Sequence, residues 1–124
     1  MSIMFKRIRI SGLKGTAIVN AMIDSGAETS VIDEKLAKKI GLVKEKLVQC
    51  ETVNGSTFTG YSSSMLVRQE LGNVSVNVVI VKNLKEKLIL GADFLQEKNV
   101  ILDFKKEIFQ IKRPLKYKSK RLRL

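Results

Sequence analysis

The chain has 124 residues, of which 44% are hydrophobic and 28% charged, and its formal net charge is +11. This length and apolar content are typical of one compact domain with a real core, and they exclude a disordered chain. No apolar run approaches the roughly 20 residues that a membrane-spanning helix needs, so we expect no membrane span.

The sequence contains no histidine and a single cysteine, Cys50. Histidine-activated nucleophiles, histidine-ligated zinc and iron–sulfur clusters are therefore excluded. We expect no metal and no cofactor, and any hydrolysis falls to carboxylates, lysines, tyrosines or hydroxyls. Cys50 is interpreted as a packed thiol. The first residues carry no long apolar stretch, which predicts no signal peptide and, with one cysteine, favours a cytoplasmic location.

The first half of the chain predicts two strands and a helix. Residues 3–10 end in alternation of charged and apolar side chains and predict a strand, and a glycine-containing turn leads to a second, nearly all-apolar strand at 16–23. Residues 33–40 predict a short helix, which Asp33 caps at its start and Gly41 ends.

The second half is rich in short strands. Residues 47–53 and 57–61 flank Asn54-Gly55, a dipeptide that favours a tight hairpin because both turn positions need positive φ. Further strands are expected at 65–67, 74–81, 88–90, 100–104 and 108–111, and a second short helix at 93–98. The sequence therefore predicts a mostly β domain, a partly closed β-barrel with one or two short helices.

The net positive charge is concentrated at the end of the chain. Residues 112–124 hold seven basic side chains and no acid, and the single proline, Pro114, marks the boundary. We therefore predict a domain over 1–111 and a basic C-terminal tail over 112–124. Such a tail suits binding to nucleic acid or an anionic surface, and the other interpretation is a solvated segment.

Residues 21–30 are the most informative stretch. An apolar strand delivers Asp24 onto a tight Ser25-Gly26 turn. The Ser25 hydroxyl and the turn amides are donors suited to orient the carboxylate, and Gly26 leaves room for a substrate backbone. Asp-Ser-Gly alone is ordinary turn chemistry. Its context is a second buried strand that runs into Gly91, 65 residues after Gly26.

With that context the sequence resembles the retropepsin-like aspartic proteases, the single-domain relatives of pepsin, over roughly residues 5–111, and their cellular and prokaryotic branch most. The matching elements are Ile23-Asp24-Ser25-Gly26-Ala27, Ser30-Val31-Ile32, the hairpin centred on Asn54-Gly55, and Ile89-Leu90-Gly91 followed by Asp93-Phe94-Leu95. The resemblance implies a retropepsin-like fold with a flap hairpin.

The resemblance also implies an activity. Each chain of the family supplies one catalytic aspartate, here Asp24, so a homodimer is required, and the two carboxylates share a proton and activate a water against a peptide bond. The substrate-binding residues it implies are Ala27, Glu28 and the flap residues Val53, Asn54, Gly55, Ser56 and Thr57. Ile89, Leu90 and Gly91 are implied as structural support, with Gly91 packed behind the catalytic turn.

The chain departs from the family pattern beside the site. Retroviral members carry an arginine where this chain has Ala92, so Glu28 lacks that partner, and whether Arg7 or Arg9 replaces it stays open. Ser25 stands where many members have threonine. Asp93 is interpreted as a helix cap or turn acid, and Phe58 and Tyr61 are expected either to face substrate or to pack.

Two functions follow from these patterns. The first is a homodimeric aspartic endopeptidase that cleaves extended peptides beside apolar side chains, through Asp24 and its mate. The alternative is a catalytically silent module of the same fold. It is either a binding module that uses residues 112–124 to bind nucleic acid or an anionic partner, or a dimerisation domain. The intact Asp-Ser-Gly favours the first, because a binding domain has no need of a desolvated carboxylate.

Overall fold

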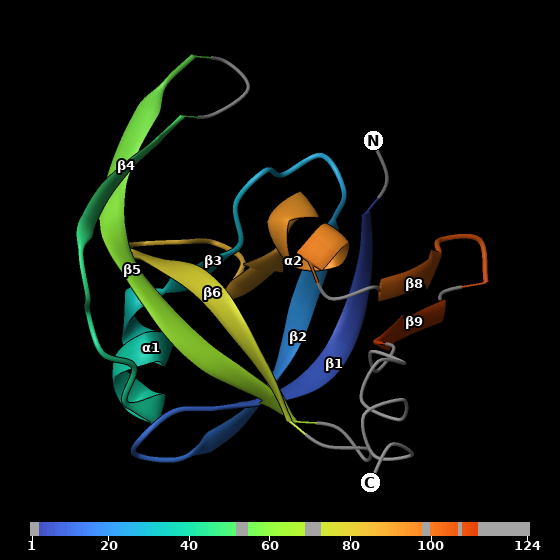
Figure 1. The fold of residues 1–124 in the computed structure, drawn as a ribbon, viewed down its shortest axis with the longest axis horizontal. Coiled ribbons are helices and arrows are strands. Elements are labelled where there is room, and N and C mark those ends of the chain that lie inside the picture. Colours follow the sequence, from blue (N-terminus) through green and yellow to red (C-terminus); the bar gives the residue numbers. More distant parts are fainter. Residues whose placement is uncertain (1–2, 52–54, 69–72, 98–99, 107, 112–124) are drawn as a thin grey trace, which may run out of the picture.

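The computed structural model describes residues 3–51, 55–68, 73–97, 100–106 and 108–111 (Figure 1). The predicted flap residues Val53 and Asn54 and the basic tail lie outside the described residues. The strands are β1 (Ile3–Ser11), β2 (Thr16–Asp24), β3 (Val31–Asp33), β4 (Leu47–Glu51), β5 (Thr57–Arg68), β6 (Val74–Val81), β7 (Leu88–Leu90), β8 (Val100–Asp103) and β9 (Ile108–Ile111), and the helices are α1 (Glu34–Ile40) and α2 (Ala92–Glu97).

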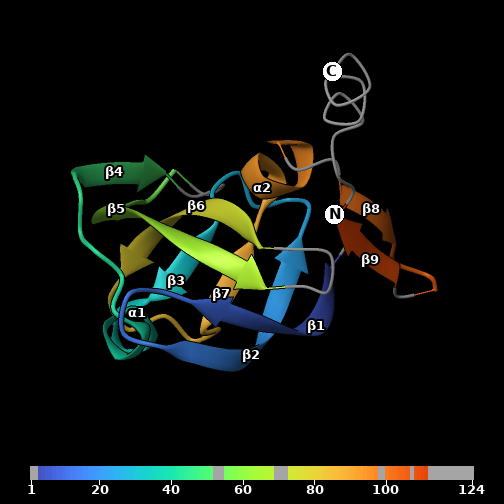
Figure 2. The ribbon, with the colours of Figure 1, turned by 60° about the horizontal axis from the view of Figure 1, so that its bottom comes forward.

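Seven of these strands form one sheet in the order β1-β2-β7-β3-β6-β5-β4, and a further pairing of β1 with β5 closes it on itself. The closing contact is short, since Arg9, Ile10 and Ser11 alone face β5 in the register. Two of the neighbouring pairs, β2 with β7 and β3 with β6, are parallel. Figure 2 shows the strands surrounding a common interior. The mostly β prediction is confirmed, with the strands in a ring rather than a regular barrel.

The interior of the ring is filled by aliphatic side chains. Ile10, Ile23, Ile32, Leu88 and Leu90 are fully buried and come from four different strands. Burying each such side chain contributes about 1.5–3 kcal/mol. The core therefore holds β2, β3 and β7 side by side. The loop after Asp24 joins β2 to β3, and β7 ends at Leu90, directly before Gly91.

Helix α1 begins and ends at the signals that the sequence contains. The Asp33 carboxylate accepts a hydrogen bond from the Lys35 N–H at 3.2 Å, and Gly41 ends the helix in the left-handed region at φ 79°. The same carboxylate accepts from the Leu84 N–H at 2.9 Å, which connects α1 to the loop before β7. Asp33 is also the last residue of β3, a strand that the sequence did not predict and that pairs with β6 and β7, both distant in the chain.

Strand β5 is longer than predicted, because the runs 57–61 and 65–67 form one strand of 12 residues. The serines between them do not interrupt the ladder. The Ser62 N–H donates to the Lys46 carbonyl at 2.8 Å, and the buried Ser63 hydroxyl donates to the Val43 carbonyl. Hydroxyls that find backbone acceptors are compatible with a strand, so the predicted break is wrong.

Strands β8 and β9 pair as a separate hairpin beside the start of β1 in both views (Figures 1 and 2). The hairpin is joined to α2 by Phe94 and Phe109, whose ring centroids lie 6.2 Å apart. Helix α2 starts one residue earlier than predicted, directly after Gly91. Among the described residues no helix is long and apolar enough to cross a membrane.

Candidate active site

The Asp24 carboxylate is held by the turn that follows it. Asp24 ends β2, and its Oδ1 accepts a hydrogen bond from the Gly26 N–H at 2.9 Å. The Ala27 N–H donates to the Asp24 carbonyl at 3.2 Å and closes the turn. Asp24 is half-buried, and Ser25 is exposed. The backbone of the turn therefore sets the direction in which this carboxylate faces the surface.

The loop after Asp24 rests on Gly91, at the end of β7. A Cβ on Gly91 would lie 2.5 Å from the Ala27 carbonyl oxygen, closer than real Cβ atoms approach. The same carbonyl accepts from the Ala92 N–H at 2.6 Å, and the Glu28 carbonyl accepts from the Asp93 N–H at 3.2 Å. The first amides of α2, which have no partner within their own helix, thus bind the loop after Asp24.

A buried pair of side chains fastens the far end of this loop. The Ser30 hydroxyl is fully buried, donates to Asp93 Oδ1 at 2.7 Å and accepts from the Gly91 N–H at 2.9 Å. Asp93 also accepts from the Ser30 N–H at 3.1 Å and from the Phe94 N–H at 2.7 Å. Asp93 is a structural acid, as interpreted. Sequence reasoning gave Ser30 no role, although a small hydroxyl at the start of an apolar run was the available signal.

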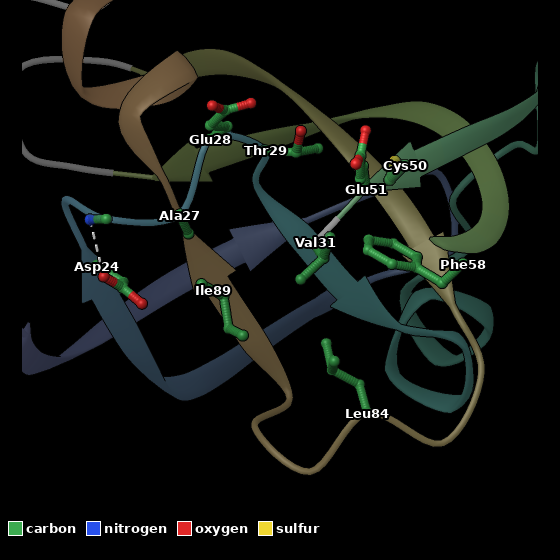
Figure 3. A pocket seen from close by; sticks show the side chains of 11 residues that line it. Asp24, Ala27, Glu28, Thr29, Val31, Cys50, Glu51, Phe58, Leu84 and Ile89 are labelled. Atoms are coloured by element: carbon green, nitrogen blue, oxygen red, sulfur yellow. Dashed lines mark hydrogen bonds between the residues drawn. The ribbon is translucent and has the colours of Figure 1, made fainter. Parts of the chain in front are cut away.

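Asp24 opens into a cleft of about 550 Å³ (Figure 3). Its lining comes from Asp24 and the loop after it, from the β4–β5 hairpin and from the region around β7. The lining residues are Asp24, Gly26, Ala27, Glu28, Thr29, Val31, Cys50, Glu51, Phe58, Leu84 and Ile89. Figure 3 shows apolar side chains at one side of this pocket and the carboxylates of Glu28 and Glu51 at the other. A cleft of this size and mixture suits a short extended segment of polypeptide.

Ala27 and Glu28, predicted to contact substrate, line the cleft. The β4–β5 hairpin contributes to the lining through residues further from its turn than predicted. The described residues Gly55, Ser56 and Thr57 are absent from the lining, whereas Cys50, Glu51 and Phe58 are part of it. Gly55 has φ 83°, as the predicted tight turn requires.

Ile89, which was predicted as structural support together with Leu90 and Gly91, lines the cleft. Alternate side chains of a strand point to opposite faces, so Leu88 and Leu90 fill the core while Ile89 faces the cleft. Leu90 and Gly91 lie on the supporting side.

Neither Arg7 nor Arg9 forms an ion pair with Glu28 in the described part of the chain. Opposite Asp24 in the register stands Ile3, and Arg7 lies four residues further along β1, roughly 13 Å away at 3.3 Å per residue. The arginine that Ala92 replaces therefore has no substitute from β1.

Cys50 lies in the cleft wall and is half-buried, rather than packed in the core. Burial raises the pKa of the Cys50 thiol, because the thiolate loses solvation. Phe58 faces the cleft, whereas Tyr61 is exposed beneath Lys44, whose Nζ lies 4.9 Å from the ring centroid. No group of three metal-ligating side chains occurs among the residues that the structure describes.

Comparison with known proteins agrees with this geometry. The model of a family described as "gag-polyprotein putative aspartyl protease" matches residues 10–97. The crystal structure of the retroviral protease-like domain of Ddi1 from Leishmania major aligns with a TM-score of 0.59 at 17% identity, covering 87% of each chain. EIAV protease, complexed with an inhibitor, aligns with a TM-score of 0.59 at 19% identity, covering 80% of this chain and 90% of that one. No curated protein matches the sequence.

These matches define the fold and the family of the protein. At such identities the solved structures show the fold alone, and that fold is retropepsin-like. The family model spans more than half of the chain, so the protein belongs to the gag-polyprotein aspartyl protease family.

The close approach at Gly91 predicts a strong effect of one methyl group. We expect Gly91→Ala to lower the free energy of unfolding by about 1–3 kcal/mol, because the new Cβ must displace the Ala27 carbonyl. Gly15→Ala is the matched control, since its Cβ meets nothing within 4 Å, and it should change stability by less than about 0.5 kcal/mol. Urea unfolding measures both, and equal effects would contradict the account.

The raised pKa of the Cys50 thiol predicts its reactivity. As pH rises, the thiolate should form later in the folded chain than in the unfolded one, so the alkylation rate by iodoacetamide should reach its midpoint at higher pH. Because Cys50 is the single cysteine, the chain in urea serves as its own control. Mass spectrometry from pH 7 to pH 10 gives the two profiles, and coincident midpoints would refute the shift.

Proposed function

We propose that the protein is a homodimeric aspartic endopeptidase, in which Asp24 of each copy completes one catalytic site. The observation that carries the proposal is the Asp24 carboxylate, fixed by the Gly26 N–H at 2.9 Å and open to a peptide-sized cleft. The family and the fold support it. The sequence holds one Asp-Ser-Gly, so a second copy has to supply the other carboxylate.

The proposed chemistry needs only the two aspartates and a water. Two adjacent carboxylates cannot both ionise freely, so the pair holds one proton. The ionised carboxylate takes a proton from the water as it attacks the peptide carbonyl, and the protonated one donates to the carbonyl oxygen and stabilises the tetrahedral oxyanion. Return of the protons to the amine and the dyad completes the hydrolysis.

Apolar surface beside Asp24 supports association of two copies. Ile3 and Phe5 are 49% and 47% exposed, and in the register they pair with Asp24 and Met22. The β8–β9 hairpin lies next to this end of β1, and among the described strands β8 and β9 pair only with each other. Exposed apolar side chains and unpaired strand edges are features that a symmetric interface covers.

The substrate we propose is an extended peptide with an apolar side chain in the cleft. Val31, Phe58 and Ile89 supply the apolar wall. The β4–β5 hairpin projects from the ring of strands (Figure 1), and its described residues Cys50, Glu51 and Phe58 line the cleft. We propose that it acts as a flap that excludes water when peptide binds. Its backbone can add main-chain hydrogen bonds to an extended segment.

The test is cleavage of a peptide library over a range of protein concentrations. We expect specific activity to rise with concentration until the dimer saturates, and Asp24→Asn, which keeps the shape of the side chain, to abolish every cut. The pH profile should be bell-shaped, because activity requires the singly protonated pair. Mass spectrometry detects the products. Cuts that persist in Asp24→Asn would contradict the proposal.

The alternative function, binding of nucleic acid or an anionic partner, depends on residues 112–124, which lie outside the described residues. No feature of the described part of the chain favours it over hydrolysis. It remains a hypothesis from the sequence alone.

A further inference from the structure

The charge of the cleft is opposite to that of the chain. Basic side chains outnumber acidic ones by 23 to 12, yet the three charged residues that line the cleft, Asp24, Glu28 and Glu51, are all acidic. Among the described residues that line the cleft there is no lysine or arginine. The charged side chains that line this cleft are therefore negative, although the protein as a whole carries a positive net charge.

Two of these carboxylates are not neutralised by the fold. Glu28 and Glu51 are exposed, and neither forms an ion pair with another residue that the structure describes. Acids elsewhere do find lysines: Glu34 pairs with Lys44 at 3.0 Å, and this hydrogen bond lowers the pKa of Glu34. The acids of the cleft thus remain available to a ligand.

The two carboxylates come from segments far apart in the sequence. Glu28 belongs to the loop after Asp24 and Glu51 ends β4, and Figure 3 shows them on the same rim of the pocket with Thr29 between them. The apolar side chains of Val31, Phe58 and Ile89 lie at the other side. Successive side chains of an extended peptide point in opposite directions, so one can enter the apolar part while its neighbour faces the rim.

We infer that Glu28 and Glu51 make the cleft selective for peptides with a lysine or arginine next to the apolar residue beside the cleaved bond. This inference rests on the proposed function and names its substrate class. Ion pairs at an exposed rim add little affinity each, but they steer association and reject like charge. The selectivity should therefore appear mainly in KM and in the association rate, and it should weaken with salt.

Binding tests this without requiring turnover. The protein is Asp24→Asn, and the probes are three fluorescent peptides of equal length that differ only in carrying lysine, glutamine or glutamate beside a central apolar pair. We expect the lysine peptide to bind about tenfold more tightly than the glutamate peptide at low salt, with most of the difference lost near 0.5 M salt. Fluorescence anisotropy gives the affinities.

Substitution assigns the effect to the two residues. Adding Glu28→Gln and Glu51→Gln to Asp24→Asn should abolish the preference for lysine, so that the lysine and glutamate peptides bind this variant with equal affinity. Glu34→Gln is the matched control, since Glu34 lies on α1 and does not line the cleft, and it should leave the preference unchanged. Equal binding of all three peptides to Asp24→Asn, or a lysine preference that survives the double substitution, would overturn the inference.

The two proposals fail in different ways. If wild-type protein cleaves peptides in an Asp24-dependent manner without regard to charge, the charge inference is wrong and the proposed function stands. If the lysine preference appears in binding and depends on Glu28 and Glu51, but no peptide is cleaved by a folded dimer, the inference about the cleft is supported and the proposed function is wrong.

Discussion

The contact between Gly91 and the Ala27 carbonyl is the constraint on which the site depends. Only a residue without a Cβ lets the end of β7 lie this close to the backbone of the loop after Asp24. That approach brings the first amides of α2 within reach of the loop carbonyls, and it places the buried Ser30 hydroxyl between the Gly91 N–H and Asp93. The loop that presents Asp24 is thus fixed by a segment more than 60 residues later. A carboxylate held on a rigid loop keeps its direction.

The same fold explains why one chain supplies only one of the two aspartates that the proposed hydrolysis requires. Each ring of strands presents one Asp24 at its surface, and the exposed side chains of Ile3 and Phe5 lie on β1, next to the end of β2 that carries it. Association of two copies would cover this apolar surface and bring the two carboxylates together in one step. Catalysis would then depend on the same contacts that hold the dimer, so protein concentration controls activity. Glu28 and Glu51 line the cleft, whereas Ile3 and Phe5 do not.

Local signals in the sequence were sufficient for strand β2, for helix α1 and for the turn after Asp24. The apolar run before Asp24, the cap at Asp33 and the turn at Gly41 each involve neighbours in the chain, and each forms as predicted. What sequence reasoning missed depends on residues distant in the chain. Strand β3 forms its pairs with β6 and β7, which are distant in the chain. The pair of Ser30 and Asp93 forms only because the residue before β3 meets the first turn of α2. The direction of Ile89 follows from the register of β7, which no local pattern specifies.

The central claim is that two copies of Asp24 share one site, and subunit mixing tests it most directly. Wild-type protein and Asp24→Asn are mixed at constant total concentration, well above the level at which the dimer saturates, and cleavage of one peptide is followed. If both aspartates are needed, a mixed dimer is inactive, and an equal mixture retains about one quarter of the wild-type activity, because active dimers form as the square of the wild-type fraction. Retention of about one half would show that each chain works alone and would contradict the account.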